Sequence, residues 1–491
     1  MATVTLKNWP RAAALLSLLA LFCIMEGIYL FAEHQAAGRF GFGLDDSWIH
    51  ATFARNLIEG RGYGLNPGEP VAGSTAPLYT FLLAGWYAIL SEVIWGAKLF
   101  GMLGLAASAC LLYLAAERLA NSRFVAWLAA AFCLASPALL WSSLNGMETT
   151  LYLVIPCAAL FFWTRERYRW MIAMLALGVW LRPEGVILLT LGWMAIPSRH
   201  RIPTAIYSAA ILLPYFAMNL CLSGYPFPAT VHTKSFLQEA HFSTGLIAES
   251  LSAAIDLHFF PVFLTLPLGL IALWKRVWWA ALYPLLFFLV EWGTSSTIAA
   301  FARYLQPAFP FVYLAIAFGV VPLLQKWPSW SRIIRIAVFC LLVLQISKTV
   351  SHAAHCGQTY QNIARMQVAV SRIVHRVTES QETVATNDIG ALGYFSNRYV
   401  IDLMGLARPY QPLEDILRMT RPTMLAIFDS WFPYRMDSRT FKTDYEQVGQ
   451  VKLEKNIICG DYVMSLYARR DRAAQIKTVI GEVIEEETGQ R

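Results

Sequence analysis

Long apolar stretches recur along the first 349 residues and decide what this chain can fold into. They lie near residues 11–33, 74–91, 96–116, 124–141, 148–163, 170–181, 184–197, 203–221, 258–274, 277–291, 303–323 and 332–349. Hydrophobic residues make up 57% of the chain and charged residues only 14%, and the mean hydropathy is +0.47. Helices that cross a bilayer need such a composition, whereas a water-soluble domain of this size does not. We therefore expect an α-helical, polytopic membrane protein.

The basic clusters between these stretches predict how the helices cross. If every stretch crossed, the clusters would fall on both sides of the membrane, against the positive-inside rule. They fall on one side if the N-terminus is cytoplasmic and residues 74–91 do not cross. These clusters are Glu117–Arg123, Arg165–Arg169, Arg199–Arg201, Lys275–Arg276 and Lys326–Arg332. We expect about eleven transmembrane helices, and the first, which follows Lys7 and Arg11, reads as a retained signal anchor.

In this topology the polar motifs share the opposite, extracytoplasmic side. They are LDD (44–46) in a first loop of residues 34–95, NGMET (145–149), RPEG (182–185), YPFPATVHTK (225–234) and FARY (301–304). The stretches that flank RPEG are short, at most about 20 Å as helices, against about 30 Å of hydrocarbon. Short helices there indicate a cavity that water and substrate can enter.

The chain changes character near residue 350. We expect residues 1–349 to form the transmembrane module and residues 350–491 a small extracytoplasmic α/β domain. Strand-like pieces are residues 382–386, 398–402, 423–429 and 461–468. The segment NDIGALGYF (387–395) predicts a strand end, a glycine-containing turn and a short helix, and residues 473–491 a charged helix or tail.

Charge and cysteine content exclude some classes of function. The net charge of +7 is loop charge that sets orientation, because no basic run carries interleaved aromatic residues as a nucleic-acid site would. The cysteines lack C-x-x-C spacing, so no metal site is predicted from them. Most lie in apolar runs as small hydrophobic residues. Cys356 and Cys459 lie in the polar region and can form a disulfide if that region is extracytoplasmic.

Asp45 and Asp46, two adjacent acids shortly after the first apolar stretch, are the main candidates for catalysis. The spacing predicts a helix from Asp46 to Ile58 with Trp48, Thr52 and Arg55 on one face. One aspartate can act as an N-cap and the other as a solvated loop acid. Alternatively, one of Asp45 and Asp46 accepts a proton from an attacking hydroxyl, while the other holds that hydroxyl, a cation or an arginine in place. Two close carboxylates raise each other's proton affinity, which suits a general base.

Basic groups on the same side form a second set of candidates. Arg182 and Glu184 flank Pro183, and Arg303 and Tyr304 begin an apolar stretch. Arg182 can simply pair with an acid on a neighbouring helix. If the substrate carries a phosphate, however, an arginine can bind it bidentately and stabilise it as a leaving group. His232 and Lys234 lie in a loop on the same side and are weak candidates for that role.

Two further acids have both a structural and a functional interpretation. Asn145 can cap the helix that follows it, and Glu148 lies farther in than a cap requires, which suits binding of a sugar hydroxyl or of an arginine. Asp388 can be an Asx-turn residue, or it can close the cavity from the side of the C-terminal domain.

Taken in order, these motifs resemble the GT-C superfamily of polyprenyl-phosphate-dependent glycosyltransferases. The motifs are LDDSWIHATFARNLIEGRGYGLNPGEPVAGSTAPLYT, NGMET, LRPEG, the HTK loop, ARYLQP and NDIGALGYFSNRYVIDLMGLARP, and they extend from about residue 10 to 470. The branch that they resemble most is that of the actinobacterial terminal β-arabinofuranosyltransferases and their proteobacterial relatives. The chain is short for that branch, whose C-terminal domain is larger.

The resemblance implies a multi-pass enzyme of the bacterial inner membrane that moves a sugar, such as arabinofuranose, from a polyprenyl phosphate to a cell-envelope glycan or glycolipid. It implies Asp45 and Asp46 as the catalytic pair. It also implies Arg182, Glu184, Arg303 and Tyr304 as donor-site residues. To these we add, from the residues themselves, Arg55, Glu148, His232, Lys234 and Asp388 as candidates for binding the donor phosphate or sugar. A divalent cation can bridge acid and phosphate, although no ligand cluster requires one. The alternatives are a transporter or flippase, which would be expected to show symmetric halves, and a GT-C enzyme that modifies lipid A or protein.

Overall fold

The structure, a computed structural model, describes residues 10–229, 244–258, 260–294 and 300–490. The contacts divide the chain into two compact units, which are described separately. The first, the helical unit, contains residues 1–32, 98–215 and 238–354. The second, the mixed unit, contains residues 33–97, 216–237 and 355–491.

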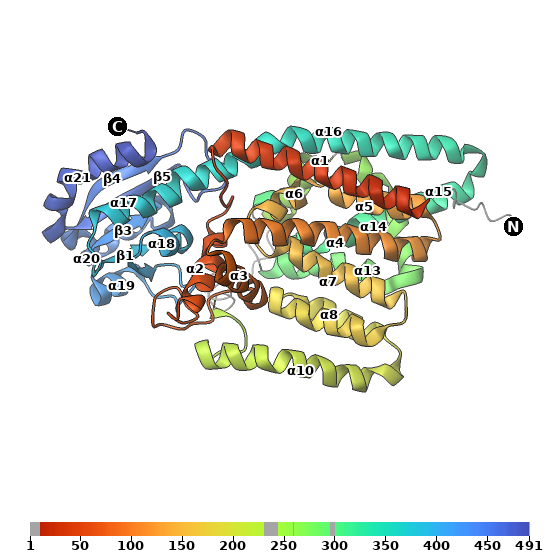
Figure 1. Cartoon of the computed structure of the whole chain (residues 1–491), viewed down its shortest axis with the longest axis horizontal. Coiled ribbons are helices and arrows are strands. Elements are labelled where there is room, and N and C mark those ends of the chain that lie inside the picture. The colour runs from red at the N-terminus through yellow and green to blue at the C-terminus, as the bar shows by residue number, and fades with distance from the viewer. Residues whose placement is uncertain (1–9, 230–243, 259, 295–299, 491) are drawn as a thin grey trace. The chain divides into compact units, whose positions relative to one another are not determined.

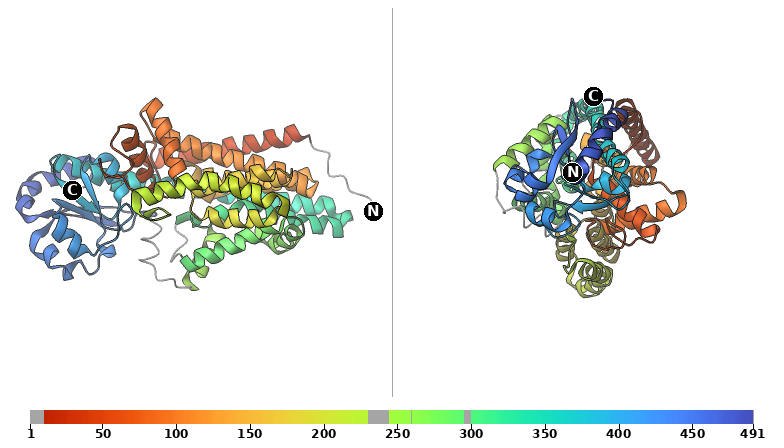
Figure 2. Two further views of the ribbon diagram at one scale, coloured as in Figure 1. Left: turned by 90° about the horizontal axis from the view of Figure 1, so that it is seen from below. Right: turned by 90° about the vertical axis from the view of Figure 1, so that its left-hand side faces the viewer.

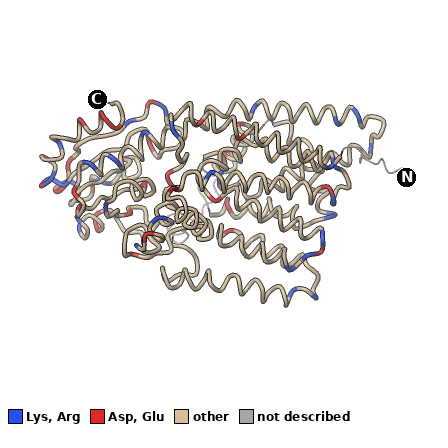
Figure 3. The backbone as a smooth tube through the Cα atoms, in the orientation of Figure 1, with Lys and Arg blue, Asp and Glu red and all other residues tan. Residues whose placement is uncertain are grey.

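The helical unit is built from apolar helices joined by short connections (Figure 1). Its helices, some of which continue into the mixed unit, are α1 (Arg11–Ala37), α4 (Ile94–Ala120), α5 (Arg123–Leu134), α6 (Pro137–Leu144), α7 (Thr149–Trp163), α8 (Tyr168–Leu181), α9 (Gly185–Ala195), α10 (Ser198–Ser223), α12 (Thr244–Leu257), α13 (Leu266–Thr294), α14 (Phe309–Phe318), α15 (Val320–Lys326) and α16 (Ser331–Ile363). Charged residues are sparse along the backbone of these helices (Figure 3).

The expected number of eleven membrane spans is not confirmed. Among the described residues, six helical segments are long and apolar enough to cross a bilayer, or up to seven if α5 and α6, bent by 57°, form one broken span. Helices α7, α8 and α9 have 15, 14 and 11 residues. At about 1.5 Å per residue they are shorter than the hydrocarbon core. The short helices predicted on either side of RPEG are confirmed.

Small residues let neighbouring helices of this unit approach closely. A Cβ on Gly269 of α13 would lie 1.6 Å from the carbonyl oxygen of Ala315 on α14. Only glycine fits at such a crossing, and small residues at helix interfaces are common in membranes, where dispersion contacts replace the hydrophobic effect between helices. The same two helices enclose large buried aromatic side chains, among them Trp279, Tyr283 and Tyr313.

The mixed unit joins the first loop to the C-terminal part of the chain. Its helices and strands are α2 (Asp46–Ile58), α3 (Pro77–Leu90), a π-helical turn (Ala364–Val368), α17 (Ala369–Val377), β1 (Thr383–Thr386), α18 (Ile389–Phe395), β2 (Tyr399–Asp402), α19 (Leu413–Thr420), β3 (Met424–Ile427), α20 (Arg439–Asp444), β4 (Tyr445–Lys452), β5 (Val463–Arg469) and α21 (Arg470–Thr488). Acidic and basic side chains are dense over its C-terminal part (Figure 3).

The five strands form one mixed sheet in the order β2-β1-β3-β5-β4. The sheet lies in the blue, C-terminal part of the ribbon (Figure 2). Strand β1 pairs in parallel with β2 and β3, whereas β5 runs antiparallel to β3 and β4. Leu425 and Ile427 of β3 pack with Ile416 and Leu417 of α19 and with other side chains of one core cluster. Because side chains alternate along a strand, Met424 and Ala426, also fully buried, belong to the opposite face of the sheet.

The local predictions for this unit are mostly confirmed. Helix α2 has the predicted bounds, and the four predicted strands correspond to β1, β2, β3 and β5. Strand β4 was missed because YEQVGQVK has weak alternation and an irregular register between Gln447 and Gly449. The predicted glycine turn at 387–395 is wrong in detail, since Gly390 lies within α18. Cys356 and Cys459 are buried and are not joined to each other, so the possible disulfide is not formed.

The expected division of the chain at residue 349/350 falls inside helix α16. The contacts instead group residues 33–97 with residues 355–491. The first loop is therefore part of the same compact unit as the C-terminal sheet.

Candidate functional site

The first cluster of candidates lies where helix α2 meets helix α18 in the mixed unit. Asp45 immediately precedes α2, yet its carboxylate caps the other helix. Its Oδ2 accepts a hydrogen bond from the backbone N–H of Gly390 at 2.8 Å, and its Oδ1 accepts one from Ala391 at 2.9 Å. A Cβ on Gly390 would lie 2.0 Å from the carbonyl oxygen of Asp45, so the two helices can approach this closely only at a glycine.

Asp45 is a carboxyl group that holds its proton unusually well. Asp45 is only 7% exposed to solvent. Burial raises its pKa well above the ordinary value, and the negative charges of Asp388 and Asp46 raise it further. The two N–H donors at the start of α18 lower the pKa, but they do not outweigh burial. The result is a group of acids that share negative charge at the N-terminal ends of two helices, where helix dipoles favour anions.

Asp388 is the second acid of this cluster and comes from the turn between β1 and α18. It is partly buried, and it accepts a hydrogen bond of 2.9 Å from Nε2 of Gln367. Burial, followed by the charge of Asp46, raises the pKa of Asp388 to about 6, although the bonds from Gln367 and Asn387 lower it. Gln367 belongs to the π-helical turn, and its Oε1 accepts a bond from the Cys459 thiol. Such turns often occur at functional sites.

Asp46 occupies the first turn of α2 and is partly exposed. Asp45 is buried and both of its oxygens accept backbone N–H groups, whereas Asp46 and Asp388 are partly exposed and so are the more accessible acids of the cluster. Within the residues that the structure describes, no three His, Cys, Asp or Glu side chains are arranged to hold a metal ion. A cluster of this kind can accept a proton.

Arg55 holds the other end of helix α18. Its Nη1 and Nη2 donate to the carbonyl oxygens of Tyr394 and Gly393 at 2.6 and 3.1 Å. Its guanidinium also lies 4.4 Å from the centre of the Tyr394 ring. Asp45 and Arg55 thus fix both ends of α18 against α2, which gives Arg55 a structural role in positioning the acids.

The second cluster of candidates lies in the helical unit, where the RPEG motif joins α8 to α9. Nη1 of Arg182 contacts Oε1 of Glu148 at 3.1 Å, and Nη2 contacts Oε1 of Glu184 at 3.4 Å. Arg182 and Glu148 are 7% and 3% exposed. Glu291, a buried acid of α13, also interacts electrostatically with Arg182. With both terminal nitrogens engaged and several acids around it, Arg182 is better suited to holding Glu148 and Glu184 than to binding a phosphate.

The FARY motif forms a tight turn in the same unit. Phe301 and Ala302 both have φ of 54°, a left-handed conformation that costs residues other than glycine about 1–3 kcal/mol each. Beside them, the ring of Phe301 stacks on Trp141 at 4.6 Å. Arg303 is buried, and its Nη2 donates to the hydroxyl of Tyr304 at 3.4 Å. Strain of this kind persists where a structure must present particular groups.

Some functional candidates were not visible in the sequence pattern, and others cannot be placed. Gln367 and Glu291 gave no signal, because each lies within a helix with no motif around it. His232 and Lys234 lie outside the described residues. Asn145 does not cap helix α7. It follows α6 and accepts a hydrogen bond from the backbone N–H of Met147.

Comparison of sequences gives one partial match. Residues 358–467 match the model of a domain of unknown function, DUF8728. This segment includes the sheet strands β1, β2, β3 and β4 and most of β5. A search of characterised proteins gives no match.

Comparison of folds gives matches over nearly the whole chain. A crystal structure of ArnT from Cupriavidus metallidurans in the apo state has a TM-score of 0.61 at 11% identity, covering 93% of this chain and 98% of ArnT. The same protein bound to undecaprenyl phosphate gives 0.57 at 10% identity, covering 92% and 97%. The apo oligosaccharyltransferase of Archaeoglobus fulgidus gives 0.59 at 11% identity, covering 94% of this chain and 78% of its own.

Likeness at such low identity establishes the fold alone. The chain therefore has the fold of these structures, apolar helices long enough to cross a membrane together with a small C-terminal sheet, which is the architecture expected from the motifs.

Proposed function

We propose that this protein is a lipid-phosphate-dependent glycosyltransferase. The proposed donor is a polyprenyl-phosphate sugar, and the acceptor is a glycan or glycolipid of the cell envelope on the extracytoplasmic face. The observation that carries the proposal is the acid cluster of Asp45, Asp46 and Asp388, in which burial and neighbouring negative charge raise the pKa of Asp45 and of Asp388 above the ordinary value. It occurs in a chain with the fold of ArnT, which has been seen with undecaprenyl phosphate, and of AglB, seen with a dolichol phosphate.

In the proposed reaction, Asp46 accepts the proton of the acceptor hydroxyl as its oxygen attacks the anomeric carbon. The bond between that carbon and the phosphate oxygen breaks, and the electron pair leaves with the lipid phosphate. Asp45 holds helix α18 in place, and Asp388 raises the proton affinity of the cluster. Asp46 is the chosen base because it is more exposed than Asp45 and lies in the first turn of α2.

A departing phosphate needs a cation, and the motif resemblance proposes Arg303 for this role. Arg182 is already paired with Glu148 and Glu184. We assign Arg182 the role of orienting Glu148 and Glu184 toward sugar hydroxyl groups, with Tyr304 beside Arg303. His232 and Lys234 remain additional candidates for the phosphate. Arabinofuranose is the sugar proposed from the motif resemblance. In a dry site, a positioned cation can supply much of the stabilisation of the leaving group.

The test is transfer by membranes that contain single variants. Membranes are incubated with defined polyprenyl-phosphate sugars, and release of the lipid phosphate is measured. We expect Asp46→Asn to lower the rate by roughly 10²–10⁴-fold, the usual contribution of a general base. Asp415→Asn is the matched control, because Asp415 is an exposed acid of the same unit paired with Arg418. Wild-type rates in the Asp46 variant would overturn the assignment, and comparing envelope glycans after gene deletion would identify the missing sugar.

A further inference from the structure

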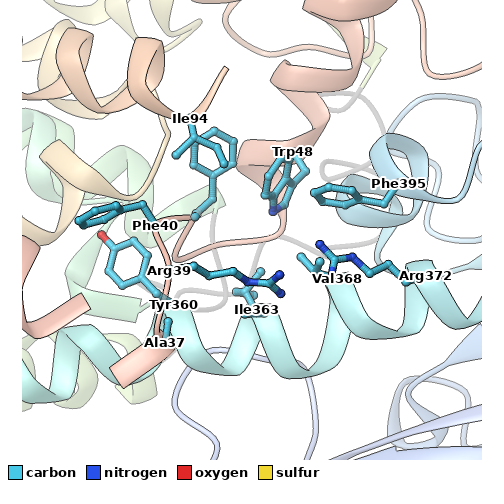
Figure 4. A pocket seen from close by; sticks show the side chains of 13 residues that line it. Ala37, Arg39, Phe40, Trp48, Ile94, Tyr360, Ile363, Val368, Arg372 and Phe395 are labelled. Carbon is cyan, nitrogen blue, oxygen red and sulfur yellow. The ribbon is translucent and has the colours of Figure 1, made fainter. Parts of the chain in front are cut away.

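A separate pocket of about 130 Å³ lies in the mixed unit (Figure 4). It is lined by the segment after α1, by Trp48 of α2, by the first residue of α4 and by the end of α16 together with α17 and α18. The side chains of Arg39 and Arg372 enter it from different segments, and their guanidinium groups point toward each other in the close view. No acidic side chain is among the described residues that line this pocket.

The two arginines carry positive charge that the protein only partly balances. Arg372 lies 3.9 Å from Glu487, a distance typical of a weak ion pair. Arg39 has no hydrogen bond or ion pair with any residue in the described part of the chain. Partial burial lowers the pKa of Arg39, the charge of Arg372 lowers it further, and Glu487 raises it. The charge of Arg372 thus disfavours the charged form of Arg39, and an anion bound between the two guanidinium groups would offset that repulsion.

The rest of the lining is apolar and aromatic. The rings of Phe40, Trp48, Tyr360 and Phe395 surround the guanidinium groups (Figure 4). The Arg372 guanidinium also lies 5.8 Å from the centre of the Phe395 ring. A ligand that fits such a lining has an anionic group attached to an apolar body. Arginine forks favour phosphate because they can donate two hydrogen bonds to it at once.

The ends of two membrane helices place this pocket at the level of a bilayer surface. Ala37 is the last residue of α1, and Ile94 is the first residue of α4. Each helix has 27 residues, is apolar enough to cross, and is about 40 Å long, more than the hydrocarbon thickness. Trp95, which is 44% exposed, packs on Phe40 beside the pocket, as expected for an aromatic belt.

We propose that this pocket binds the headgroup phosphate of an anionic membrane phospholipid, with Arg39 and Arg372 as its ligands. Basic pockets between membrane helices bind such headgroups in other proteins. Trp48 lines the pocket and lies in the first turn of α2, two residues from Asp46. The bound lipid would therefore stabilise helix α2, which carries Asp46 of the acid cluster. This proposal does not depend on the glycosyltransferase function, because its readout is lipid binding.

The experiment titrates phosphatidylglycerol into the purified full-length protein in a neutral detergent and measures the dissociation constant. We expect Arg39→Gln and Arg372→Gln each to weaken binding about tenfold, the loss of roughly one charge-assisted hydrogen bond. Arg39→Lys should lose less, since it retains the charge. Arg61→Gln is the matched control, an exposed arginine paired with Glu59 away from the pocket. Phosphatidylcholine should bind more weakly and without dependence on either arginine.

Three further arms identify the source of the anion. Inorganic phosphate and undecaprenyl phosphate are titrated separately, and the thermal unfolding midpoint of each variant is measured without lipid. Unchanged phosphatidylglycerol binding in the Arg39→Gln, Arg372→Gln double variant would overturn the proposal. So would arginine-dependent binding of inorganic phosphate or undecaprenyl phosphate alone. An unfolding midpoint in the variants equal to that of the wild type would show that lost binding is not lost folding.

Discussion

At the scale of single residues, the acid cluster is held together by the carboxylate of Asp45, which accepts hydrogen bonds from helix α18, far away in the sequence. Asp45 accepts hydrogen bonds from the backbone N–H groups of Gly390 and Ala391, which are more than 340 residues away in the chain. Those bonds keep a buried acid in place, and burial together with the nearby acids keeps its pKa high. Proton affinity in this cluster is therefore a collective property. Removing one charge should change the titration of the remaining acids.

A first prediction concerns the pH dependence of transfer. The charge of Asp388 raises the pKa of Asp45, and Asp388 also interacts with Asp46. In Asp388→Asn the remaining acids lose their protons more easily. The acidic limb of the rate profile should therefore move to lower pH, as measured by sugar transfer between pH 4 and 8. An unchanged limb, or one moved to higher pH, would contradict a role for Asp388 in setting the proton affinity.

A second prediction concerns stability and follows from the sign of the same shift. The pKa of Asp388 is about 6 in the folded protein against an ordinary value of 3.8. The folded state thus binds the proton more tightly, so the stabilising contribution is present below pH 3.8 and is lost as pH rises through 6. At pH 7 Asp388→Asn should raise the free energy of unfolding by about 1–3 kcal/mol, with partial exposure favouring the lower value.

The measurement is the thermal unfolding midpoint of the full-length protein from pH 4 to pH 7.5. The midpoint of the variant should exceed that of the wild type at pH 7 and converge with it at pH 4. A variant that is less stable at pH 7 would mean that the carboxylate form of Asp388 is stabilised by its surroundings.

At the scale of helices and strands, the pairing of α2 with α18 sets the geometry of the site. Both helices are short, with 13 and 7 residues, and Asp45 and Arg55 fix the two ends of α18. The close approach at Gly390 allows this pairing. A side chain at that position should therefore push α18 away and release the carboxylate of Asp45.

A third prediction tests the pairing of α2 with α18 by comparing a glycine that has no room for a side chain with one that has open space around it. Gly390→Ala places a Cβ 2.0 Å from the Asp45 carbonyl oxygen, and such overpacking costs about 1–3 kcal/mol. Gly481→Ala, in α21, meets no atom within 4 Å and should stabilise the helix by about 0.5–1 kcal/mol. Unfolding midpoints and transfer rates are measured for both. Full transfer activity in the Gly390 variant would separate the position of α18 from catalysis.

The sequence pattern predicts single elements better than it predicts their partners. Helix α2 and four strands follow from local periodicity, because side-chain spacing is written along the chain itself. The edge strand β4 was missed because Gly449 and polar residues interrupt its alternation. The approach of Gly390 to Asp45 could not be predicted, since nothing local to either residue requires it. The sequence alone identified these acids as candidates from their residue type and position. That Asp45, Asp46 and Asp388 lie together was visible only in the structure.

At the scale of the whole molecule, apolar length alone overestimates the number of membrane crossings. Several of the apolar stretches form helices of 11–15 residues, too short to span a bilayer alone. The first loop belongs with the C-terminal sheet in one unit, a grouping that depends on contacts between distant residues. The orientation of the chain in the membrane, by contrast, was argued from charge, and it can be tested independently of the fold.

The last prediction therefore concerns orientation. The loop between α7 and α8 carries Arg165 and Arg167, Arg169 follows in the first turn of α8, and positively charged loops remain cytoplasmic. In a variant whose exposed native cysteines are replaced, a membrane-impermeant thiol reagent should label Ser380→Cys, an exposed position of the mixed unit, in intact cells. Arg167→Cys, also exposed, should react only after the membrane is opened. The reverse labelling pattern would place the acid cluster on the cytoplasmic side. Nucleotide sugars are available there as donors, so a polyprenyl-phosphate sugar would no longer be required.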